Sequence, residues 1–383
     1  MSRAFVIVLD SAGCGGAPDA ADFGDAGANT LGHIHRATGL QMPALNALGL
    51  GAALHHSTGY NAQWSAPIRG GWAVATEVSK GKDTPSGHWE LAGVPVPWDW
   101  HYFPDAAPAF PADVIAAVTN LAGGSLCNTH ASGIPVIENF GAEHVRTGVP
   151  ICYTSVDSVF QIAAHEDVFG LERLYDLCRD MAQILHPMKV GRVIARPFTG
   201  TEDHFERTTN RKDFAISPPS RTLCDWAYDA GRKVHGIGKI GDIFSMQGIT
   251  DCQKGDDLAL MGHLSNAMDT AEDGSLTFAN FVEFDTLYGH QRDPEGYARH
   301  LEWFDAAVAT ILAKTRPDDL VIFTADHGND PTFKGTDHTR ERVPVLVHGC
   351  DVGAIGDIAM VDVAASVADH LDLPKPTSGV SFL

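Results

Sequence analysis

The chain has 383 residues, of which 44% are hydrophobic and 20% charged, and its formal net charge is −21. This length is sufficient for two domains with a sizeable core. The acidic balance argues against general binding to nucleic acid or to anionic membranes, although bound cations can still attract an anionic substrate. No stretch approaches the roughly 18 uninterrupted apolar residues that a membrane span needs.

The N-terminus leads directly into an apolar run, Ala4–Leu9, without the apolar core and cleavage site of a signal peptide. Seven cysteines are scattered along the chain without a CxxC pair, which is typical of free thiols in a reducing compartment. We therefore expect a cytoplasmic protein. We also expect a monomer, because no heptad seam or long apolar stripe indicates an assembly.

Strand-like and helix-like segments alternate along most of the chain, which is typical of an α/β protein with a mostly parallel sheet flanked by helices. Strands are predicted, in chain order, at Ala4–Leu9, Trp72–Val78, Lys233–Gly238, Thr277–Phe284, Leu320–Thr324 and Val343–Val347. Helices are predicted at Asp256–Met268, at Tyr297–Leu312, where apolar residues recur every three or four positions, and at Asp362–Leu371.

The middle of the chain has a different composition. From about Trp98 it is rich in proline and aromatic residues, and a second proline-rich stretch, Ser217–Ser220, closes the region. The elements predicted between these limits are two helices and two strands, namely Val114–Leu121, Leu171–Leu185, Ile151–Thr154 and Val190–Ala195. We interpret residues 99–221 as a smaller α/β domain inserted into a core domain formed by residues 1–98 and 222–383.

Three apolar runs that resemble buried strands are each followed by an aspartate, and histidines lie close to two of these aspartates. Taken singly, each aspartate is better explained as a helix N-cap and each histidine as a surface residue. The repetition favours one polynuclear metal site at the carboxyl edge of a parallel sheet. Carboxylates and imidazoles without thiolates suit Mn²⁺, Zn²⁺ or Mg²⁺, and cations would compensate the buried negative charge. The predicted ligands are Asp10, Asp285, His290, Asp326, His327 and His338.

The segment Gly81–Glu90 follows a predicted strand and contains two hydroxyl groups, those of Thr84 and Ser86. A helix can begin at Ser86, and its N-terminal dipole would stabilise a phosphate on a nearby hydroxyl. Coordination to a cation could also deprotonate such a hydroxyl. By itself, the segment is better explained as a proline-containing turn that caps a helix.

Basic residues are concentrated at the end of the predicted inserted domain: Lys189, Arg192, Arg196, Arg207, Arg211, Lys212 and Arg221. Only four acidic residues lie among them, so the stretch is positively charged within an acidic protein. The planar guanidinium group binds phosphate in a bidentate manner, whereas a solvated loop is an equally good explanation. Lys239, in a glycine-rich run without the spacing of known phosphate-binding loops, is a further candidate for a phosphate contact.

Five segments taken together carry a family resemblance, namely Asp10, Lys82–Glu90, Asp285–His290, Asp326–Asp330 and Thr336–Thr339. They resemble the bacterial phosphopentomutases, a family of the alkaline phosphatase superfamily. The resemblance covers essentially the whole chain, including Tyr153–Ala163 and Arg192–Pro197, and is weakest at Ala106–Gly124. Asp-His-Gly at residues 326–328 is shared by the superfamily, whereas Asp-Thr-x-x-Gly-His-Trp-Glu at residues 83–90 is much more specific.

The resemblance implies an alkaline-phosphatase-like core with an inserted cap domain, and a role for each matching residue. Thr84 would be phosphorylated. Two Mn²⁺ ions would bind, one to Thr84, Asp10, Asp326 and His327 and the other to Asp285, His290 and His338. Around the pentose phosphate, the family uses the positions matched here by Ser155, Asp157, Arg192 and Lys239.

The implied reaction interconverts α-D-ribose 1-phosphate, or its 2-deoxy form, and the corresponding 5-phosphate. It would proceed through a phosphothreonine and a bisphosphate intermediate, with a sugar bisphosphate as primer. One alternative is a phosphatase or another phosphomutase of the same superfamily, such as a metal-dependent phosphoglycerate mutase. That mutase is expected to use a serine in an Asn-Ser block, which is absent here. A metal-stabilised binding protein without turnover is the second alternative.

Overall fold

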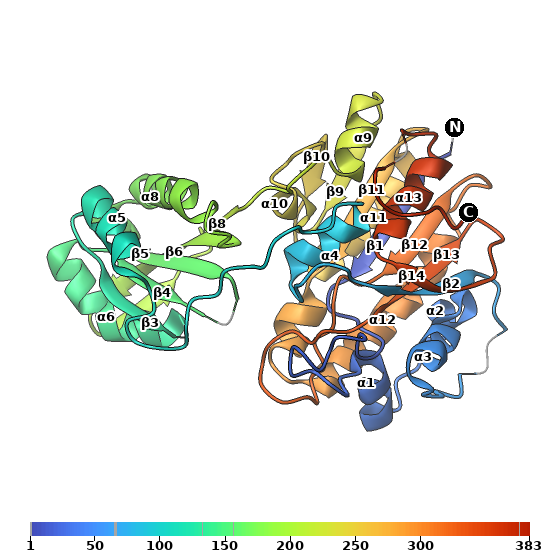
Figure 1. Cartoon of the computed structure of the whole chain (residues 1–383), viewed down its shortest axis with the longest axis horizontal. Coiled ribbons are helices and arrows are strands. Elements are labelled where there is room, and N and C mark those ends of the chain that lie inside the picture. Colours follow the sequence, from blue (N-terminus) through green and yellow to red (C-terminus); the bar gives the residue numbers. More distant parts are fainter. Residues whose placement is uncertain (1, 65–66, 132, 156, 375) are drawn as a thin grey trace. The chain divides into compact units, whose positions relative to one another are not determined.

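The protein is described from a computed structural model, which covers residues 2–64, 67–131, 133–155, 157–374 and 376–383. The chain folds into two compact units (Figure 1). The first unit combines Met1–Pro97 with Pro218–Leu383, and the second is formed by Trp98–Ser217. None of the helices in the described parts of the chain has the length and apolar character required to cross a membrane.

A large sheet forms the centre of the first unit. Its strands are β1 (Ala4–Leu9), β2 (Gly71–Thr76), β9 (Val234–Ile237), β10 (Asp251–Gln253), β11 (Leu276–Phe281), β12 (Leu320–Thr324), β13 (Val343–His348) and β14 (Ala354–Ala359). Their order within the described residues is β10-β9-β11-β1-β12-β13-β2-β14. Neighbours run parallel except at β13, which is antiparallel to β12 and β2. The predicted mostly parallel sheet is confirmed.

Helices cover both faces of this sheet (Figure 1). One layer contains α1 (Thr30–Thr38), α2 (Pro43–Leu48), α3 (Leu50–Thr58), α11 (Asp257–Thr270) and α12 (Pro294–Leu312). The other layer contains α4 (Thr84–Leu91), α9 (Leu223–Asp229), α10 (Ile240–Ile243) and α13 (Val361–His370). Because β11, β1 and β12 lie between the layers, every residue of these strands is buried.

The strand β11 is shorter than the sequence predicts. It ends at Phe281, and the chain then forms a π-helix, η1 (Phe284–Gly289), which carries Asp285. Asp257 accepts hydrogen bonds from the first two backbone N–H groups beyond the strand, at 3.1 and 3.3 Å. The ring of Phe284 packs against aromatic side chains of α12 instead of extending the sheet. The prediction that this strand extends to Phe284 was therefore wrong, because the strand ends three residues earlier at Phe281.

The second unit is a smaller α/β structure. Its strands are β3 (Leu126–His130), β4 (Ile151–Thr154), β5 (Val159–His165), β6 (Arg192–Thr201), β7 (His204–Arg207) and β8 (Lys212–Ala215). Its helices are α5 (Ala112–Ala122), α6 (Gly133–Thr147), α7 (Glu166–Phe169) and α8 (Leu171–Leu185). The described strands follow the order β3-β4-β5-β6-β7, and β8 also pairs with β6. Helices α5 and α8 form an apolar core on one face of the sheet, and α6 covers part of the other.

A buried ion pair joins the amino end of β1 to the turn before β12. Arg3 donates from Nη2 to Asp319 Oδ2 at 2.6 Å and from Nε to Asp319 Oδ1 at 2.9 Å, and both side chains are almost fully buried. A third N–H of Arg3 donates to the carbonyl oxygen of Met268 at 2.9 Å. The guanidinium group thus holds the ends of two central strands and of α11 together.

We expect Asp319→Ala to lower the free energy of unfolding by about 3–5 kcal/mol, because it leaves a buried guanidinium group without its counter-charge. Urea denaturation would measure the change. Asp318→Ala removes an exposed neighbouring carboxylate and should stay within about 0.5 kcal/mol of the wild type. Equal effects of the two substitutions would contradict this role of the ion pair.

Candidate metal centre and phosphoryl acceptor

Three aspartates lie at the carboxyl ends of three adjacent strands. Asp10 follows β1 directly, Asp326 lies just beyond β12, and Asp285 is carried by η1 beyond β11. Because β11, β1 and β12 are parallel neighbours, their ends meet at one edge of the sheet. The exposed fractions of Asp10, Asp285 and Asp326 are 0%, 5% and 0%. The structure therefore brings together, in a buried place, all three aspartates that the sequence singled out.

His327 lies between two of these carboxylates. Its Nε2 atom is 3.4 Å from Asp10 Oδ1 and 3.3 Å from Asp326 Oδ2. Its Nδ1 atom donates to the carbonyl oxygen of Gly328 at 3.1 Å, so Nε2 presents a lone pair toward the carboxylates. The ring of His338 stacks on that of His327, with centroids 4.1 Å apart.

His290 and His338 gather at the third carboxylate. His290 Nε2 lies 3.1 Å from Asp285 Oδ2, and His338 Nε2 lies 3.5 Å from Asp285 Oδ1. The two Nε2 atoms are 3.2 Å from each other. His290 donates from Nδ1 to the carbonyl oxygen of Thr336 at 2.7 Å, which fixes the ring. A ring held in this way through Nδ1, with Nε2 directed at a shared carboxylate, is the usual arrangement of a metal-binding histidine.

The donor atoms form two overlapping groups. Asp10, Asp326 and His327 make up one, and Asp285, His327 and His338 the other, and within each group the ligand atoms lie within 4.8 Å of one another. Asp10 Oδ1 and Asp326 Oδ2 are buried and have no hydrogen-bond partner among the described residues. Because such oxygens are costly to bury unpaired, these residues fit a site for two divalent cations bound by oxygen and imidazole nitrogen.

The electrostatics of the site favour added positive charge. Burial, together with the negative charges of Asp326 and Asp285, raises the pKa of Asp10 well above its usual value. Burial lowers the pKa of His327 to about 4, so this imidazole is uncharged at neutral pH. Burial also opposes ionisation of Asp285, but the charge of His338 and the hydrogen bonds from His290 and His338 together outweigh it and hold the pKa of Asp285 well below its usual value. Divalent cations would keep all three carboxylates ionised.

Thr84 presents its hydroxyl to this centre. It is the first residue of α4, and its Oγ1 atom lies 3.3 Å from His327 Nε2. Ser86, the other hydroxyl considered from the sequence, donates from Oγ to the capping residue Asp83 at 3.3 Å. A negatively charged group on Thr84 would be stabilised by the N-terminus of the helix. Of the two hydroxyl groups, that of Thr84 is therefore the candidate phosphoryl acceptor.

The position of α4 depends on a very close approach at Gly87. A Cβ atom at Gly87 would lie 2.1 Å from the backbone oxygen of Asp326. Other side chains of the helix anchor it elsewhere. Trp89 donates from Nε1 to a carbonyl oxygen of α10 at 3.0 Å, and the carboxylate of Glu90 accepts backbone N–H bonds from the loop after β2. The segment 83–90 thus holds Thr84 against the loop after β12 that carries Asp326 and His327.

Two buried charged residues, Arg340 and Glu341, lie shortly after His338, and the sequence did not indicate a role for either. Arg340 donates to Glu77 Oε2 at 2.6 Å and to a carbonyl oxygen of the loop before α4, also at 2.6 Å. Glu341 accepts bonds from the backbone N–H and the hydroxyl of Thr30, at 2.9 and 2.7 Å. Burial raises the pKa of Glu341 to about 7. Their only sequence signal is charge before an apolar strand, which is equally typical of an exposed loop.

Ser155, Asp157 and Arg192, predicted to contact substrate, lie in the second unit at one end of its sheet. Arg192 donates from Nη2 to Asp157 Oδ2 at 2.9 Å. Gln161 donates from Nε2 to Ser155 Oγ at 3.1 Å, and its Oε1 accepts a bond from Arg196 Nε at 3.0 Å. Gln161, which is itself buried, therefore links Ser155 to Arg196.

Further arginines crowd this part of the second unit. Burial, the charge of Arg211 and that of Arg207 lower the pKa of Arg196 to about 10. Asp213 compensates Arg211 through two hydrogen bonds of 2.7 Å. Most of the basic stretch found in the sequence is therefore gathered around β6, where neighbouring guanidinium groups favour binding of an anion, whereas Arg221 lies in the first unit.

Lys239 belongs to the first unit. It directly follows the turn at the carboxyl end of β9, on the same edge of the sheet as the aspartates. Its positive charge opposes the rise in the pKa of Asp10. Lys239 is therefore close enough to act on the centre electrostatically.

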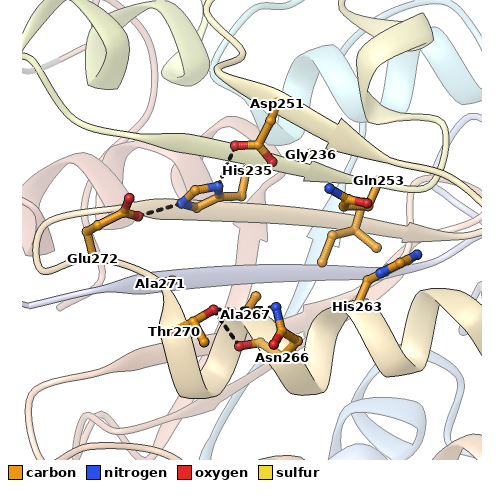
Figure 2. A pocket seen from close by; sticks show the side chains of 11 residues that line it. His235, Gly236, Asp251, Gln253, His263, Asn266, Ala267, Thr270, Ala271 and Glu272 are labelled. Atoms are coloured by element: carbon orange, nitrogen blue, oxygen red, sulfur yellow. Dashed lines mark hydrogen bonds and ion pairs between the residues drawn. The ribbon is translucent and has the colours of Figure 1, made fainter.

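A separate cavity of about 400 Å³ lies between β9, β10 and α11 (Figure 2). Within it, His235 is held between Asp251 and Glu272, at 2.8 and 2.9 Å. His235 is level with Phe5 in the sheet, toward the amino ends of the strands and away from Asp10. No lysine or arginine is among the described residues that line the cavity, so its chemistry does not suit a phosphate group.

We expect Gly87→Ala to weaken Mn²⁺ binding by roughly tenfold or more, because the new methyl group must displace the backbone of Asp326. It should also cost about 1–3 kcal/mol of stability through overpacking. Titration calorimetry and thermal unfolding would measure both effects. Gly262→Ala in α11 is the matched control, since a Cβ atom there meets no atom within 4 Å. Wild-type Mn²⁺ affinity in Gly87→Ala would show that the close approach is not needed.

The comparisons with known proteins agree with this geometry. The structure of the PH0037 protein from Pyrococcus horikoshii aligns with a TM-score of 0.50, covering 97% of each chain at 12% sequence identity, so the two share a fold. The family model described as the Metalloenzyme superfamily matches residues 2–375.

Curated relatives are much closer in sequence. The phosphopentomutase of Chelativorans sp. (strain BNC1) is 52% identical, over 100% of this chain and 98% of its own length. The phosphopentomutase of Agrobacterium fabrum (strain C58 / ATCC 33970) is 50% identical over the full length of both chains. The predicted α/β core of the alkaline phosphatase type is thereby confirmed. The chain belongs to the Metalloenzyme superfamily and, within it, to the phosphopentomutase family of mutases.

Proposed function

We propose that this enzyme interconverts ribose 1-phosphate, or 2-deoxyribose 1-phosphate, and the corresponding 5-phosphate through a phosphothreonine. The observation that carries the proposal is the position of Thr84. Its hydroxyl oxygen lies at a helix N-terminus, 3.3 Å from a nitrogen of the candidate metal centre. The names of the full-length relatives support pentose phosphates as the substrates.

The metal centre in this proposal holds two cations, Mn²⁺ or alternatively Zn²⁺ or Mg²⁺. Thr84, Asp10, Asp326 and His327 would bind one of them. Asp285, His290 and His338 would bind the second. When bound, the cations would supply electrostatic stabilisation of the phosphoryl oxygens in the transition state.

Thr84 carries the phosphoryl group between the two positions of the sugar. In the first step, the bond from phosphorus to Thr84 Oγ1 breaks, a bond to the free sugar hydroxyl forms, and that hydroxyl loses its proton. The product is a pentose bisphosphate. In the second step, Thr84 Oγ1 takes the other phosphoryl group, and the sugar oxygen that is released regains a proton. A sugar bisphosphate would prime the enzyme by phosphorylating Thr84.

The second unit acts as a cap in this proposal, with residues 99–221 inserted into a core domain of residues 1–98 and 222–383. Ser155, Asp157 and Arg192 would contact the sugar phosphate from the cap, and Lys239 would contact it from the core. A cap that excludes water protects the phosphothreonine from hydrolysis, which a mutase requires. The arginines near β6 support this role, because they concentrate positive charge in an acidic protein.

We also propose that the enzyme works in the cytoplasm. All seven cysteines are free thiols, and burial raises the pKa of Cys14, Cys152 and Cys224 to about 12. Thiols of this kind are unreactive and typical of a reducing compartment. A monomer stays our expectation for the assembly.

A coupled assay with ribose 5-phosphate, Mn²⁺ and a trace of sugar bisphosphate tests the reaction. We expect ribose 1-phosphate to form without stoichiometric release of inorganic phosphate, because Thr84 returns each phosphoryl group to a sugar. A phosphatase would release phosphate as fast as substrate disappears. A binding protein would retain ribose 5-phosphate unchanged. Either of these two results would overturn the proposal.

Replacing Thr84 with alanine should abolish phosphorylation and lower turnover by at least about 10⁴-fold, because the phosphoryl carrier is lost. Intact-mass analysis after incubation with the bisphosphate would detect the added phosphate. Ser86→Ala is the matched control, since it removes the neighbouring hydroxyl and should keep the added mass. Phosphate retained by Thr84→Ala, or lost in Ser86→Ala, would assign the carrier to another residue.

A further inference from the structure

His88 connects the candidate phosphoryl acceptor to the metal centre. It lies in α4 one turn after Thr84, and its side chain is fully buried. Its Nδ1 atom lies 2.9 Å from the carbonyl oxygen of Thr84 and 3.1 Å from Asp326 Oδ2. The side chain therefore folds back along the first turn of the helix and reaches a predicted metal ligand at the same time.

The hydrogen on the ring of His88 must be located on Nδ1. A carbonyl oxygen has no hydrogen to donate, so Nδ1 donates to Thr84, and the same edge of the ring lies 3.1 Å from Asp326 Oδ2, which has no hydrogen-bond partner among the described residues. The other ring nitrogen, Nε2, is buried and has no hydrogen-bond partner among the described residues. The ring stacks on Phe278, with centroids 6.0 Å apart and an interplanar angle of 27°. Only the Nδ1 edge of the ring thus makes polar contacts.

The two carboxylate oxygens of Asp326 have different surroundings, and His88 contacts only one of them. Asp326 Oδ1 accepts backbone N–H bonds from Ser11 and His327, both at 3.1 Å. Asp326 Oδ2 instead lies between His88 Nδ1 at 3.1 Å and His327 Nε2 at 3.3 Å. The electropositive Nδ1–H edge of His88 on one side of Oδ2 favours one orientation of this carboxylate toward the centre.

We propose that His88 is a positioning residue that fixes Thr84 and Asp326 relative to each other, through the hydrogen bond from Nδ1–H to Thr84 and the close electrostatic contact of the same edge of the ring with Asp326 Oδ2. This inference rests on the proposed role of Thr84 as phosphoryl carrier. The other anchors of α4, Trp89 and Glu90, hold the helix to α10 and to the loop after β2. His88 therefore sets the distance and the angle between the hydroxyl and the metal ligands, on which phosphoryl transfer depends.

Two amide substitutions separate this role from simple packing. His88→Asn places an amide N–H close to the position of Nδ1, whereas His88→Gln places it closer to the position of Nε2. We expect His88→Gln to slow phosphorylation of Thr84 by at least about tenfold and to weaken Mn²⁺ binding by about 10–100-fold. His88→Asn should stay within about threefold of the wild type in both measurements.

His370→Gln is the control for replacing a partly buried histidine in the same unit. His370 contacts the carbonyl oxygen of Arg3, at the amino end of β1 and therefore at the opposite edge of the sheet from Asp10. It should leave both measurements unchanged. Phosphorylation is followed by intact mass and Mn²⁺ binding by titration calorimetry, with thermal unfolding to verify that each variant is folded.

The outcomes distinguish this inference from the proposed function. If the wild type never carries phosphate on Thr84, the proposed function fails, while the Mn²⁺ affinities of the variants still test the contact between His88 and Asp326. If the wild type is phosphorylated and His88→Gln matches it in rate and in Mn²⁺ affinity, the inference fails alone. Equal losses in His88→Asn and His88→Gln would also overturn it, because they would indicate a packing role.

Discussion

Burying three carboxylates side by side is the constraint on which the rest of the structure depends. The strands β11, β1 and β12 are adjacent and parallel, so the residues at their carboxyl ends lie close together at one edge of the sheet. Burial and the neighbouring charges raise the pKa of Asp10, which expresses the cost of this arrangement. Amide groups relieve part of it, since Asn280 donates to Asp10 at 3.0 Å and Asn329 to Asp285 at 2.7 Å. Because the negative charge is only partly compensated, this edge of the sheet is a candidate cation site.

The candidate phosphoryl acceptor approaches this centre from a different layer of the fold. The helix α4 can reach the loop after β12 because Gly87 has no side chain, and its motif residues attach it to its surroundings. Behind it, Arg340 ties the loop before α4 to the segment that follows His338. Several side chains of the segment 83–90 thus attach α4 to its surroundings, and together they hold the hydroxyl of Thr84 at the candidate metal centre.

The sequence was sufficient for features that are written in local patterns. The limits of β1, β12, β4 and α8 were predicted to the residue, since each is a clear apolar or amphipathic run. The end of β11 was not, because a distant carboxylate, that of Asp257, diverts the chain. The six metal-ligand candidates were found from strand ends, whereas Arg340 and Glu341 were not, because only tertiary structure shows that their charges are buried. The roles of all these residues stay predictions.

The order of the strands has a consequence for biosynthesis. Asp10 is among the first residues made, yet its strand pairs with β11 and β12, which are made near the end of the chain. Pairing strands that are so far apart in the sequence closes a long loop and is slow, and β1 cannot pair until both neighbouring strands have been synthesised. Most of the chain is therefore synthesised before Asp10 has both of its neighbouring strands, and the candidate metal ligands can come together only late in folding.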